Sequence, residues 1–303
     1  MRRSVILVVI VILALAGSYF GKKSVSRPLI APSGTEARAY RRIVSLAPSI
    51  TEMLFTLGLG DRVIGVTRFC KYPPEALRIK KMGGFYDPNY EAIIAARPDL
   101  VILSVEQQNT GKYLTSAGLK ALKVDHSTIS GILSALKEIG RVCGAQQEAL
   151  DAVTALNQRM DLVMSKTRGL PRRSVLISIA RSLGSQSLSD IYIAGKDEFY
   201  DEMITLAGGR NAYQGRMKYP TISREGILKL NPEVIVDLVP ETAEQDWEDE
   251  AILKEWGHFS SVDAVRNRRV HVFRQGFMVI PGPRFILTVE ELARVIHPEV
   301  KWN

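Results

Sequence analysis

The sequence predicts an α/β protein with two Rossmann-like lobes, each built on a mostly parallel sheet, joined by one long rigid α-helix. Three observations predict this fold. Short apolar runs of strand length alternate with segments of helical periodicity. A segment of 22 residues without Pro or Gly, Ala145–Lys166, separates two such series. A sequence pattern that precedes this segment returns after it at a constant offset.

The length of 303 residues suits two cores of about 100–150 residues each. We expect an N-terminal lobe over residues 42–144, a linking helix over 145–168 and a C-terminal lobe over 172–303. The strands expected in the first lobe are Ile43–Leu46, Arg62–Val66, Asp99–Leu103 and Ala121–Val124. Those expected in the second lobe are Ser174–Ile179, Val234–Leu238 and Val270–Phe273.

Helices are expected between these strands. In the first lobe, Pro48 and Ser49 turn the chain, and Thr51–Leu57 has helical spacing that ends at Gly58. Apolar residues recur at helical spacing through Ala145–Lys166. At 1.5 Å per residue this helix would be roughly 33 Å long, enough for a stiff bridge between two lobes.

The two halves of the chain share local patterns. Glu91–Ile102 matches Glu225–Val236 at an offset of 134 residues, and TEMLFTLGLG from Thr51 is echoed by DEMITLAGG from Asp201. Two matches in the same order indicate two similarly built lobes. The alternative is that βαβ units resemble one another wherever they occur.

Residues 1–21 are typical of a secretory signal peptide or an uncleaved anchor. Arg2 and Arg3 precede an apolar run over Val5–Ala16, which ends in the small-x-small pattern Ala14-Leu15-Ala16. The run is shorter than the about 20 residues that span a bilayer, so cleavage and retention both stay open. Either outcome places the body in the periplasm or at the extracytoplasmic face of the cytoplasmic membrane.

Most of the positive charge lies outside the expected lobes. Residues 1–42 contain eight Lys and Arg and one Glu, a net charge of +7, which leaves +1 of the total +8 for the rest. We expect residues 22–41 to form a basic tether. A nucleic-acid binder needs a basic face on its folded part, so we expect no nucleic-acid partner.

The sequence contains no recognised catalytic motif. It lacks GxSxG, a P-loop, GxGxxG and HExxH, and its four histidines are scattered singly. Cys70 and Cys143 form no CxxC pair, and we interpret them as buried thiols, with a disulfide as the alternative in an exported protein. We therefore expect no catalytic residue, no metal site and no cofactor.

Two glutamates occupy equivalent positions in the repeat. Asn89 and Ser223 each precede a Glu by two positions and are good N-caps, which places Glu91 and Glu225 in first helical turns. The macrodipole alone favours acids there by roughly 0.3–1 kcal/mol. Their symmetry suggests instead one exposed carboxylate per lobe, placed to dock onto arginines of a two-subunit membrane partner.

Three segments carry a family resemblance: Ile43–Ala76, Asn89–Leu103 and Ser223–Val236. They resemble the periplasmic-binding proteins of vitamin B12 and ferric-siderophore ABC importers, and the likeness extends over about Arg42 to Pro298. Tyr72–Ala76 resembles the vitamin B12-binding members in particular. The resemblance implies a binding protein, not an enzyme, that docks Glu91 and Glu225 onto an ABC permease dimer with its ATPase.

The resemblance also implies a metal chelate as cargo. We expect a corrinoid, with a ferric siderophore or haem as the alternative and an exported enzyme acting on such a chelate as the alternative of another class. Ligands collect beyond the carboxyl ends of parallel strands, where aromatic faces suit flat rings and arginines suit anions. The residues expected to contact the ligand are Phe69, Tyr72, Phe85, Tyr86, Arg181, Gln275, Phe277 and Arg284.

Overall fold

The computed structural model describes residues 40–183, 191–240 and 247–302. The signal or anchor expected over 1–21 lies outside these ranges, as does the tether over 22–41 except for its last two residues. In the ranges that are described, no helix combines the length and the apolar character needed to cross a membrane.

The N-terminal lobe, meaning here the described residues that precede helix α6, contains one parallel sheet. Its strands are β1 (Ile43–Ser45), β2 (Val63–Val66), β3 (Leu100–Ser104) and β4 (Ala121–Val124). Its α-helices are α2 (Pro48–Thr56), α3 (Tyr90–Ala95), α4 (Gln108–Ser116) and α5 (Ile129–Cys143). The strand order is β2-β1-β3-β4, and each expected strand is present within one residue at each end.

Helix α6 (Gln146–Thr167) follows, and the C-terminal lobe comprises the described residues after it. Its strands are β5 (Ser174–Ala180), β6 (Ile191–Ile193), β7 (Arg210–Asn211), β8 (Thr221–Ile222), β9 (Val234–Leu238) and β10 (Val270–Phe273). Its α-helices are α7 (Phe199–Leu206), α8 (Arg224–Leu230), α9 (Asp249–Trp256), α10 (Asp263–Arg266) and α11 (Phe285–Ile296).

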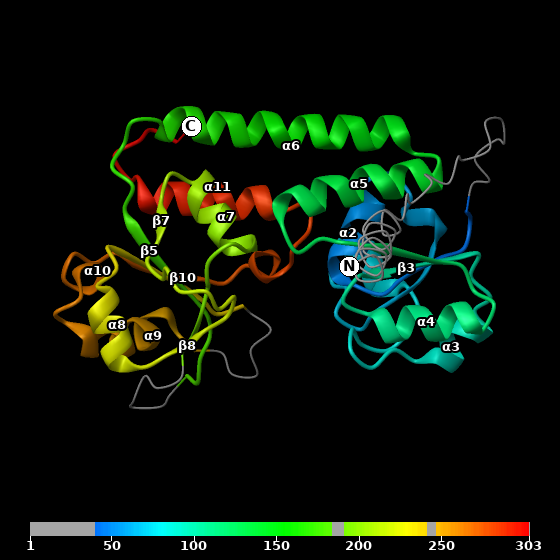
Figure 1. Ribbon diagram of the computed structural model, residues 1–303, viewed down its shortest axis with the longest axis horizontal. Helices are drawn as coiled ribbons and strands as arrows, with labels where there is room; N and C mark the ends of the chain where they lie inside the picture. Colours follow the sequence, from blue (N-terminus) through cyan, green and yellow to red (C-terminus); the bar gives the residue numbers. More distant parts are fainter. Residues whose placement is uncertain (1–39, 184–190, 241–246, 303) are drawn as a thin grey trace, which may run out of the picture. The chain divides into compact units, whose positions relative to one another are not determined.

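The two sheets share a topology (Figure 1). The parallel order β2-β1-β3-β4 of the first lobe returns as β7-β5-β9-β10 in the second. Two strands that the sequence did not predict, β6 and β8, add antiparallel pairing beside β5. Both are only two or three residues long, which gives too little alternation for a sequence pattern to show.

Both faces of each sheet are covered. Successive residues of a strand point to opposite sides of the sheet, so alternate residues belong to different cores. In β3, Leu100 and Ile102 face a core formed with α2 and α5, whereas Val101 and Leu103 face a second core that includes residues of α3 and α4. This arrangement explains why the strands are continuous apolar runs in the sequence.

The repeat detected in the sequence is also a repeat of the backbone. Asn89 Oδ1 accepts a hydrogen bond from the Ala92 amide, and Ser223 Oγ accepts one from the Gly226 amide, so both predicted N-caps are confirmed. At the other ends of these helices, Arg97 and Asn231, again 134 residues apart, have φ of 47° and 40°.

Helix α2 begins three residues earlier than expected. Pro48 does not turn the chain but occupies the first turn of the helix, where its missing N–H has no intrahelical partner and its fixed φ suits the helix. The predicted end is correct, since Gly58 follows α2 with a φ of 67°.

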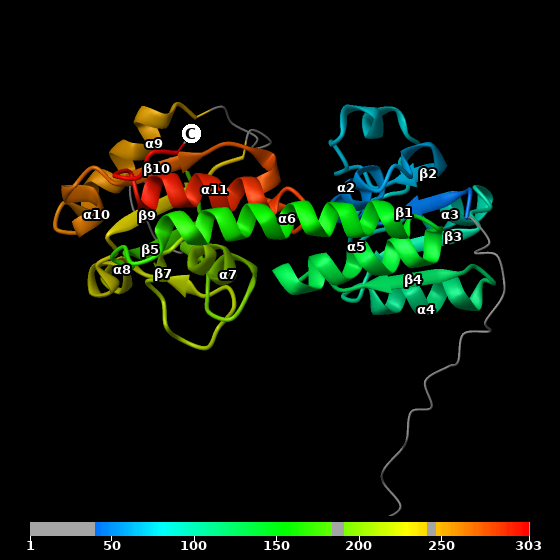
Figure 2. The ribbon, with the colours of Figure 1, turned by 90° about the horizontal axis from the view of Figure 1, so that it is seen from above.

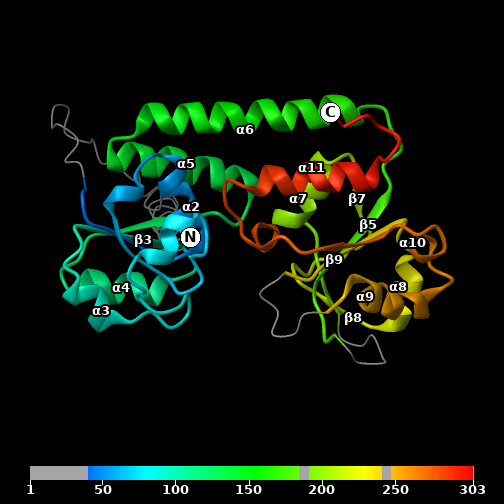
Figure 3. The same cartoon turned by 180° about the vertical axis from the view of Figure 1, so that it is seen from behind.

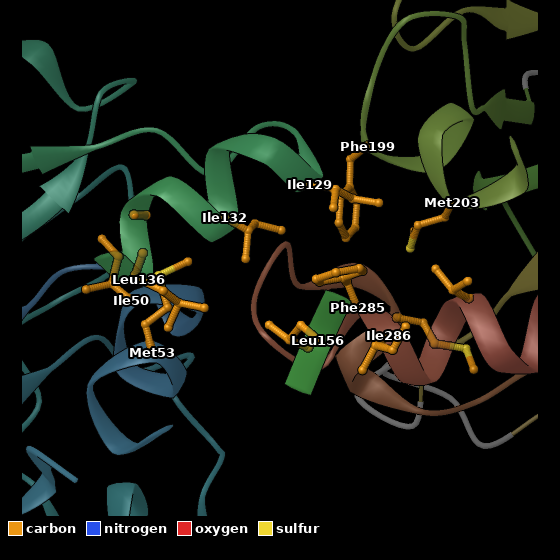
Figure 4. Packing of buried hydrophobic residues seen from close by; sticks show 14 of the residues in the cluster. Ile50, Met53, Ile129, Ile132, Leu136, Leu156, Phe199, Met203, Phe285 and Ile286 are labelled. Atoms are coloured by element: carbon orange, nitrogen blue, oxygen red, sulfur yellow. The ribbon is translucent and has the colours of Figure 1, made fainter. Parts of the chain in front are cut away.

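Helix α6 runs along both lobes, packed against α5 of the first and α11 of the second (Figures 1 and 2). Arg159 on α6 forms a bidentate ion pair with Glu290 on α11, in which Nε and Nη2 each donate to one carboxylate oxygen at 2.8 Å. The lobes are joined by more than this helix, because one hydrophobic cluster continues through both and through the buried face of α6. In Figure 4, Ile129 of α5 lies beside Phe199 of α7, and Leu156 of α6 lies near Ile286 of α11.

Both cysteines are free and buried, so the disulfide alternative is wrong. Cys70 Sγ accepts a hydrogen bond from Thr51 Oγ1 at 3.2 Å. Burial raises the pKa of the Cys143 thiol to about 11, which keeps it protonated and unreactive at neutral pH.

Candidate ligand pocket

A pocket of about 600 Å³ lies where the lobes face one another. It is open beyond the carboxyl ends of β1, β2 and β10, as expected for ligand sites of parallel sheets. Three cationic and three aromatic side chains dominate its walls. The lining residues are Pro48, Glu52, Arg68, Phe69, Lys71, Tyr72, Gly276, Phe277, Val279, Ile280 and Arg284.

Arg284 is the central polar group of the pocket. Its Nε and Nη2 donate to the two carboxylate oxygens of Glu52 at 2.9 and 2.6 Å. Its Cζ lies 3.8 Å from the centroid of the Tyr72 ring and 5.2 Å from that of Phe277. The guanidinium is therefore held between two aromatic faces by a bidentate pair, a geometry that Lys could not reproduce.

The Glu52 carboxylate is almost fully buried, with a side chain 3 % exposed. Burial raises the pKa of Glu52, and the hydrogen bonds and charge of Arg284 counteract that rise. A buried carboxylate without this guanidinium would cost several kcal/mol, so the two residues depend on one another.

The other cations of the pocket are more accessible. Arg68 pairs with Asp87 at 2.8 Å in an exposed ion pair and lies 5.0 Å from the centroid of Phe69. Lys71 is exposed on the same loop. An anionic group in the pocket would lie near Arg68 and Lys71 at the rim and near the edge of the Arg284 guanidinium inside the pocket.

Four of the eight residues expected to contact the ligand line this pocket: Phe69, Tyr72, Phe277 and Arg284. Three others lie outside its lining. Phe85 is half-buried against its own lobe, Tyr86 is 90 % exposed with its ring 4.8 Å from that of Phe85, and Gln275 is exposed next to the lining residue Gly276.

The structure does not place Arg181 where a ligand could reach it. Its side chain is only 2 % exposed, and its Nε donates to Asp237 Oδ2 at 2.8 Å. Nη1 pairs with Glu255, and the guanidinium lies over the Trp256 ring. Arg181 follows a central strand, and the carboxylates that neutralise it come from β9 and α9, which its local sequence could not reveal.

Three charged residues of the pocket were not predicted from the sequence: Glu52, Arg68 and Lys71. Arg68 and Lys71 lie within two positions of the expected residue Phe69. The sequence therefore predicted that this loop contacts the ligand but not that its basic side chains line the pocket. Glu52 had a usable signal, because the TEM of the first lobe matches the DEM of the second at Glu202.

Glu91 and Glu225 are both exposed in the first turns of α3 and α8. Hydrogen bonds from its own backbone and from Ser223 lower the pKa of Glu225, so this carboxylate is ionised at neutral pH. In both lobes these helices lie on the side away from α6 (Figures 1 and 3).

Comparisons with known proteins agree with this architecture. A family model described as periplasmic binding protein matches residues 43–275. An uncharacterized ABC transporter substrate-binding lipoprotein, YvrC, of Bacillus subtilis is 32% identical over 267 residues, covering 86% of this chain and 81% of that protein. A vitamin B12-binding protein of Salmonella typhimurium is 25% identical over 260 residues, covering 84% and 90%.

Among solved structures, a periplasmic heme binding protein from Pseudomonas aeruginosa superimposes with a TM-score of 0.74 at 25% identity, covering 86% of this chain and 94% of that one. The chain therefore belongs to the periplasmic binding protein family, as an ABC transporter substrate-binding protein of the Fe/B12 class, and this is a family of binding proteins, not of enzymes.

Proposed function

We propose that this protein captures a metal chelate in the pocket between its lobes, outside the cytoplasm, and delivers it to an ABC permease dimer with its ATPase. The observation that carries the proposal is the composition of the pocket. Phe69, Tyr72 and Phe277 give the pocket aromatic surface that suits a flat ligand, while the neighbouring cations offer charge and hydrogen-bond donors.

The first candidate cargo is a corrinoid. Its support is the likeness of the chain to vitamin B12-binding relatives and the three aromatic side chains, which suit packing on a flat macrocycle. Phe69, Tyr72, Phe277 and Arg284 are the proposed contact residues.

A second candidate, haem or another anionic chelate, is favoured by the charge of the pocket. Three cations line it against one carboxylate, Glu52, which is already paired. Carboxylates on the rim of a planar chelate would gain from Arg68 and Lys71, whereas neutral amides would gain less.

Absorption spectra distinguish these candidates. Purified protein should be titrated with cobinamide, cobalamin, haemin and a ferric catecholate siderophore, and the bound probe recovered unchanged. Saturable binding of one probe in a 1:1 ratio supports the proposal and identifies the cargo class. If none of the four binds, the proposed cargo class is wrong.

Delivery is proposed to use Glu91 and Glu225. Each carboxylate is exposed in a first helical turn, and the two lie at equivalent positions of the two lobes. Arginine pockets on a symmetric permease dimer would bind one glutamate each and so fix the orientation of the binding protein.

A further inference from the structure

Helices α2 and α7 are equivalent elements of the two lobes. Both helices contain the dipeptide Glu-Met. Each is followed two residues after its last residue by a glycine with positive φ, 67° at Gly58 and 81° at Gly208. The turns are closed alike, since the Gly58 amide donates to Phe55 O and the Gly208 amide to Thr205 O. This equivalence pairs Glu52 on α2 with Glu202 on α7.

Each of these glutamates crosses to the other lobe. Glu52 binds Arg284, the N-cap residue of α11. Glu202 Oε2 accepts a hydrogen bond from the Ile129 amide at 2.6 Å, in the first turn of α5. Helices α5 and α11 are themselves equivalent, because each follows the outermost parallel strand of its lobe and packs against α6.

The two contacts thus form a reciprocal arrangement. Helix α2 packs on α5 in its own lobe while its carboxylate reaches the N-terminus of α11, and α7 packs on α11 while its carboxylate reaches the N-terminus of α5. The hydrophobic cluster that continues through both lobes includes residues of all four helices, namely Ile50, Ile129, Phe199 and Phe285 (Figure 4).

We propose that Glu52 and Glu202 are a pair of interlobe clasps that fix the spacing of the two lobes and hold the pocket ready for its ligand. Apolar packing alone is non-directional and would permit sliding of the interface. A bidentate ion pair and a charge-assisted bond to a helix N-terminus each demand one geometry. Two such contacts at separate points oppose both rotation and translation.

The loop before α11 supports this assignment. A Cβ at Gly282 would lie 3.2 Å from Glu52 Oε2 and 3.3 Å from the Ser49 Cα. Glycine therefore lets the loop of one lobe approach the helix of the other closely enough for Arg284 to reach Glu52.

The clasps differ in one useful respect. Glu52 lines the pocket, whereas neither Glu202 nor Ile129 does. A loss of ligand affinity on removal of Glu202 must therefore arise from the spacing of the lobes and not from a lost contact. This functional half of the inference rests on the proposed function; the structural half does not.

The test measures the distance between the lobes. Spin labels at Lys112→Cys on α4 and Lys229→Cys on α8, both exposed, report an interlobe distance distribution by pulsed EPR in the full chain. The buried native cysteines are checked for labelling in the unsubstituted protein. Glu52→Ala and Glu202→Ala are each expected to shift and broaden the distribution, and Glu138→Ala, which breaks an exposed pair within α5, to leave it unchanged.

Because Glu52→Ala leaves the partly buried Arg284 guanidinium without its carboxylate, the double variant Glu52→Gln with Arg284→Met provides the same test at similar volume and without either charge. An unaltered distance distribution in Glu202→Ala and in this double variant would overturn the clasps.

The second test measures ligand affinity. For the probe that binds the wild type, Glu202→Ala is expected to lower affinity roughly tenfold through lost preorganisation. Unchanged affinity despite a broadened distribution would refute the functional half. If no probe binds the wild type, the proposed cargo fails and the distance measurement still decides the clasps.

Discussion

Among single residues, the buried carboxylates divide into those that are paired with a cation and those that are not. Glu52 has the guanidinium of Arg284. Glu198, which is 3 % exposed at the start of α7, accepts hydrogen bonds from the Gly195 amide at 3.3 Å and from the Tyr219 hydroxyl, and has no cation in bonding contact among the described residues. Loss of solvation raises the pKa of Glu198 from 4.5 to about 7.

Glu198 should therefore make stability depend on pH. The folded state binds its proton more tightly than the unfolded chain does, so its stabilising effect is complete below pH 4.5 and is lost as the pH rises through 7. Glu198→Gln should remove this decline, which is on the order of 2–3 kcal/mol between the two pH values. Urea denaturation over this range measures it, with exposed Glu148→Gln as the control; parallel curves for wild type and Glu198→Gln would contradict the assignment.

Aromatic side chains provide a residue-scale test of the pocket. Tyr72→Ala and Phe277→Ala are each expected to weaken binding of the identified probe by about 1–3 kcal/mol, since both line the pocket and flank Arg284. Tyr86→Ala, 90 % exposed and outside the lining, is the matched control. Equilibrium titration checks this, and a larger loss in Tyr86→Ala than in the other two would move the site towards the Phe85–Tyr86 loop.

At the scale of elements, equivalent turns lie in different surroundings. Gly58 and Gly208 close the same turn, but a Cβ at Gly58 meets nothing within 4 Å. A Cβ at Gly208 would lie 2.7 Å from Thr167 Cβ and 2.8 Å from His297 Nε2. The repeat thus determines the backbone conformation of both turns. Whether a side chain can be added at the glycine depends on how closely the end of α6 and the C-terminal segment pack against it.

This difference predicts unequal costs for the same substitution. Gly58→Ala should lower the free energy of unfolding by about 1 kcal/mol, the cost of positive φ. Gly208→Ala should lower it by roughly 3 kcal/mol or more, because overlap with Thr167 and His297 is added. Chemical denaturation of both variants measures this, and equal losses would show that the end of α6 yields without cost.

At the level of the whole molecule, the surfaces that we propose for ligand capture and for delivery are separate. The pocket is lined by α2, two loops and the N-cap of α11, whereas Glu91 and Glu225 lie on α3 and α8. Changes to one surface should therefore leave the other intact.

The double variant Glu91→Ala with Glu225→Ala is expected to retain wild-type affinity for the identified probe and to lose delivery. Uptake by cells that contain the cognate permease and ATPase measures delivery, and titration measures affinity. The double variant Glu148→Ala with Glu250→Ala, which removes two other exposed carboxylates, is the control. Normal uptake by the variant that lacks both Glu91 and Glu225 would contradict their proposed role in docking.

Local sequence was sufficient wherever an element is defined by its own periodicity and caps. The seven expected strands, the long helix and the caps at Asn89 and Ser223 are all present. The apolar pattern of a strand or helix and the capping side chain of a helix are all contained within a few consecutive residues. The short strands β6 to β8 and the first turn of α2 were not predicted, since pairing partners define the former and proline at a helix start resembles a turn.

Local sequence patterns are enough to predict two similar α/β lobes, a helix between them and loops at one edge that carry aromatic and basic side chains. They do not predict which of those side chains share a pocket and which are neutralised within a lobe, because that depends on tertiary contacts. Arg181 and Arg284 look alike in sequence, yet one is buried with Asp237 and Glu255 and the other meets Glu52 across the pocket. Whether each guanidinium is buried or reaches the pocket depends on carboxylates that are 56 residues away for Arg181 and 232 residues away for Arg284, and no local sequence pattern shows that these groups meet in space.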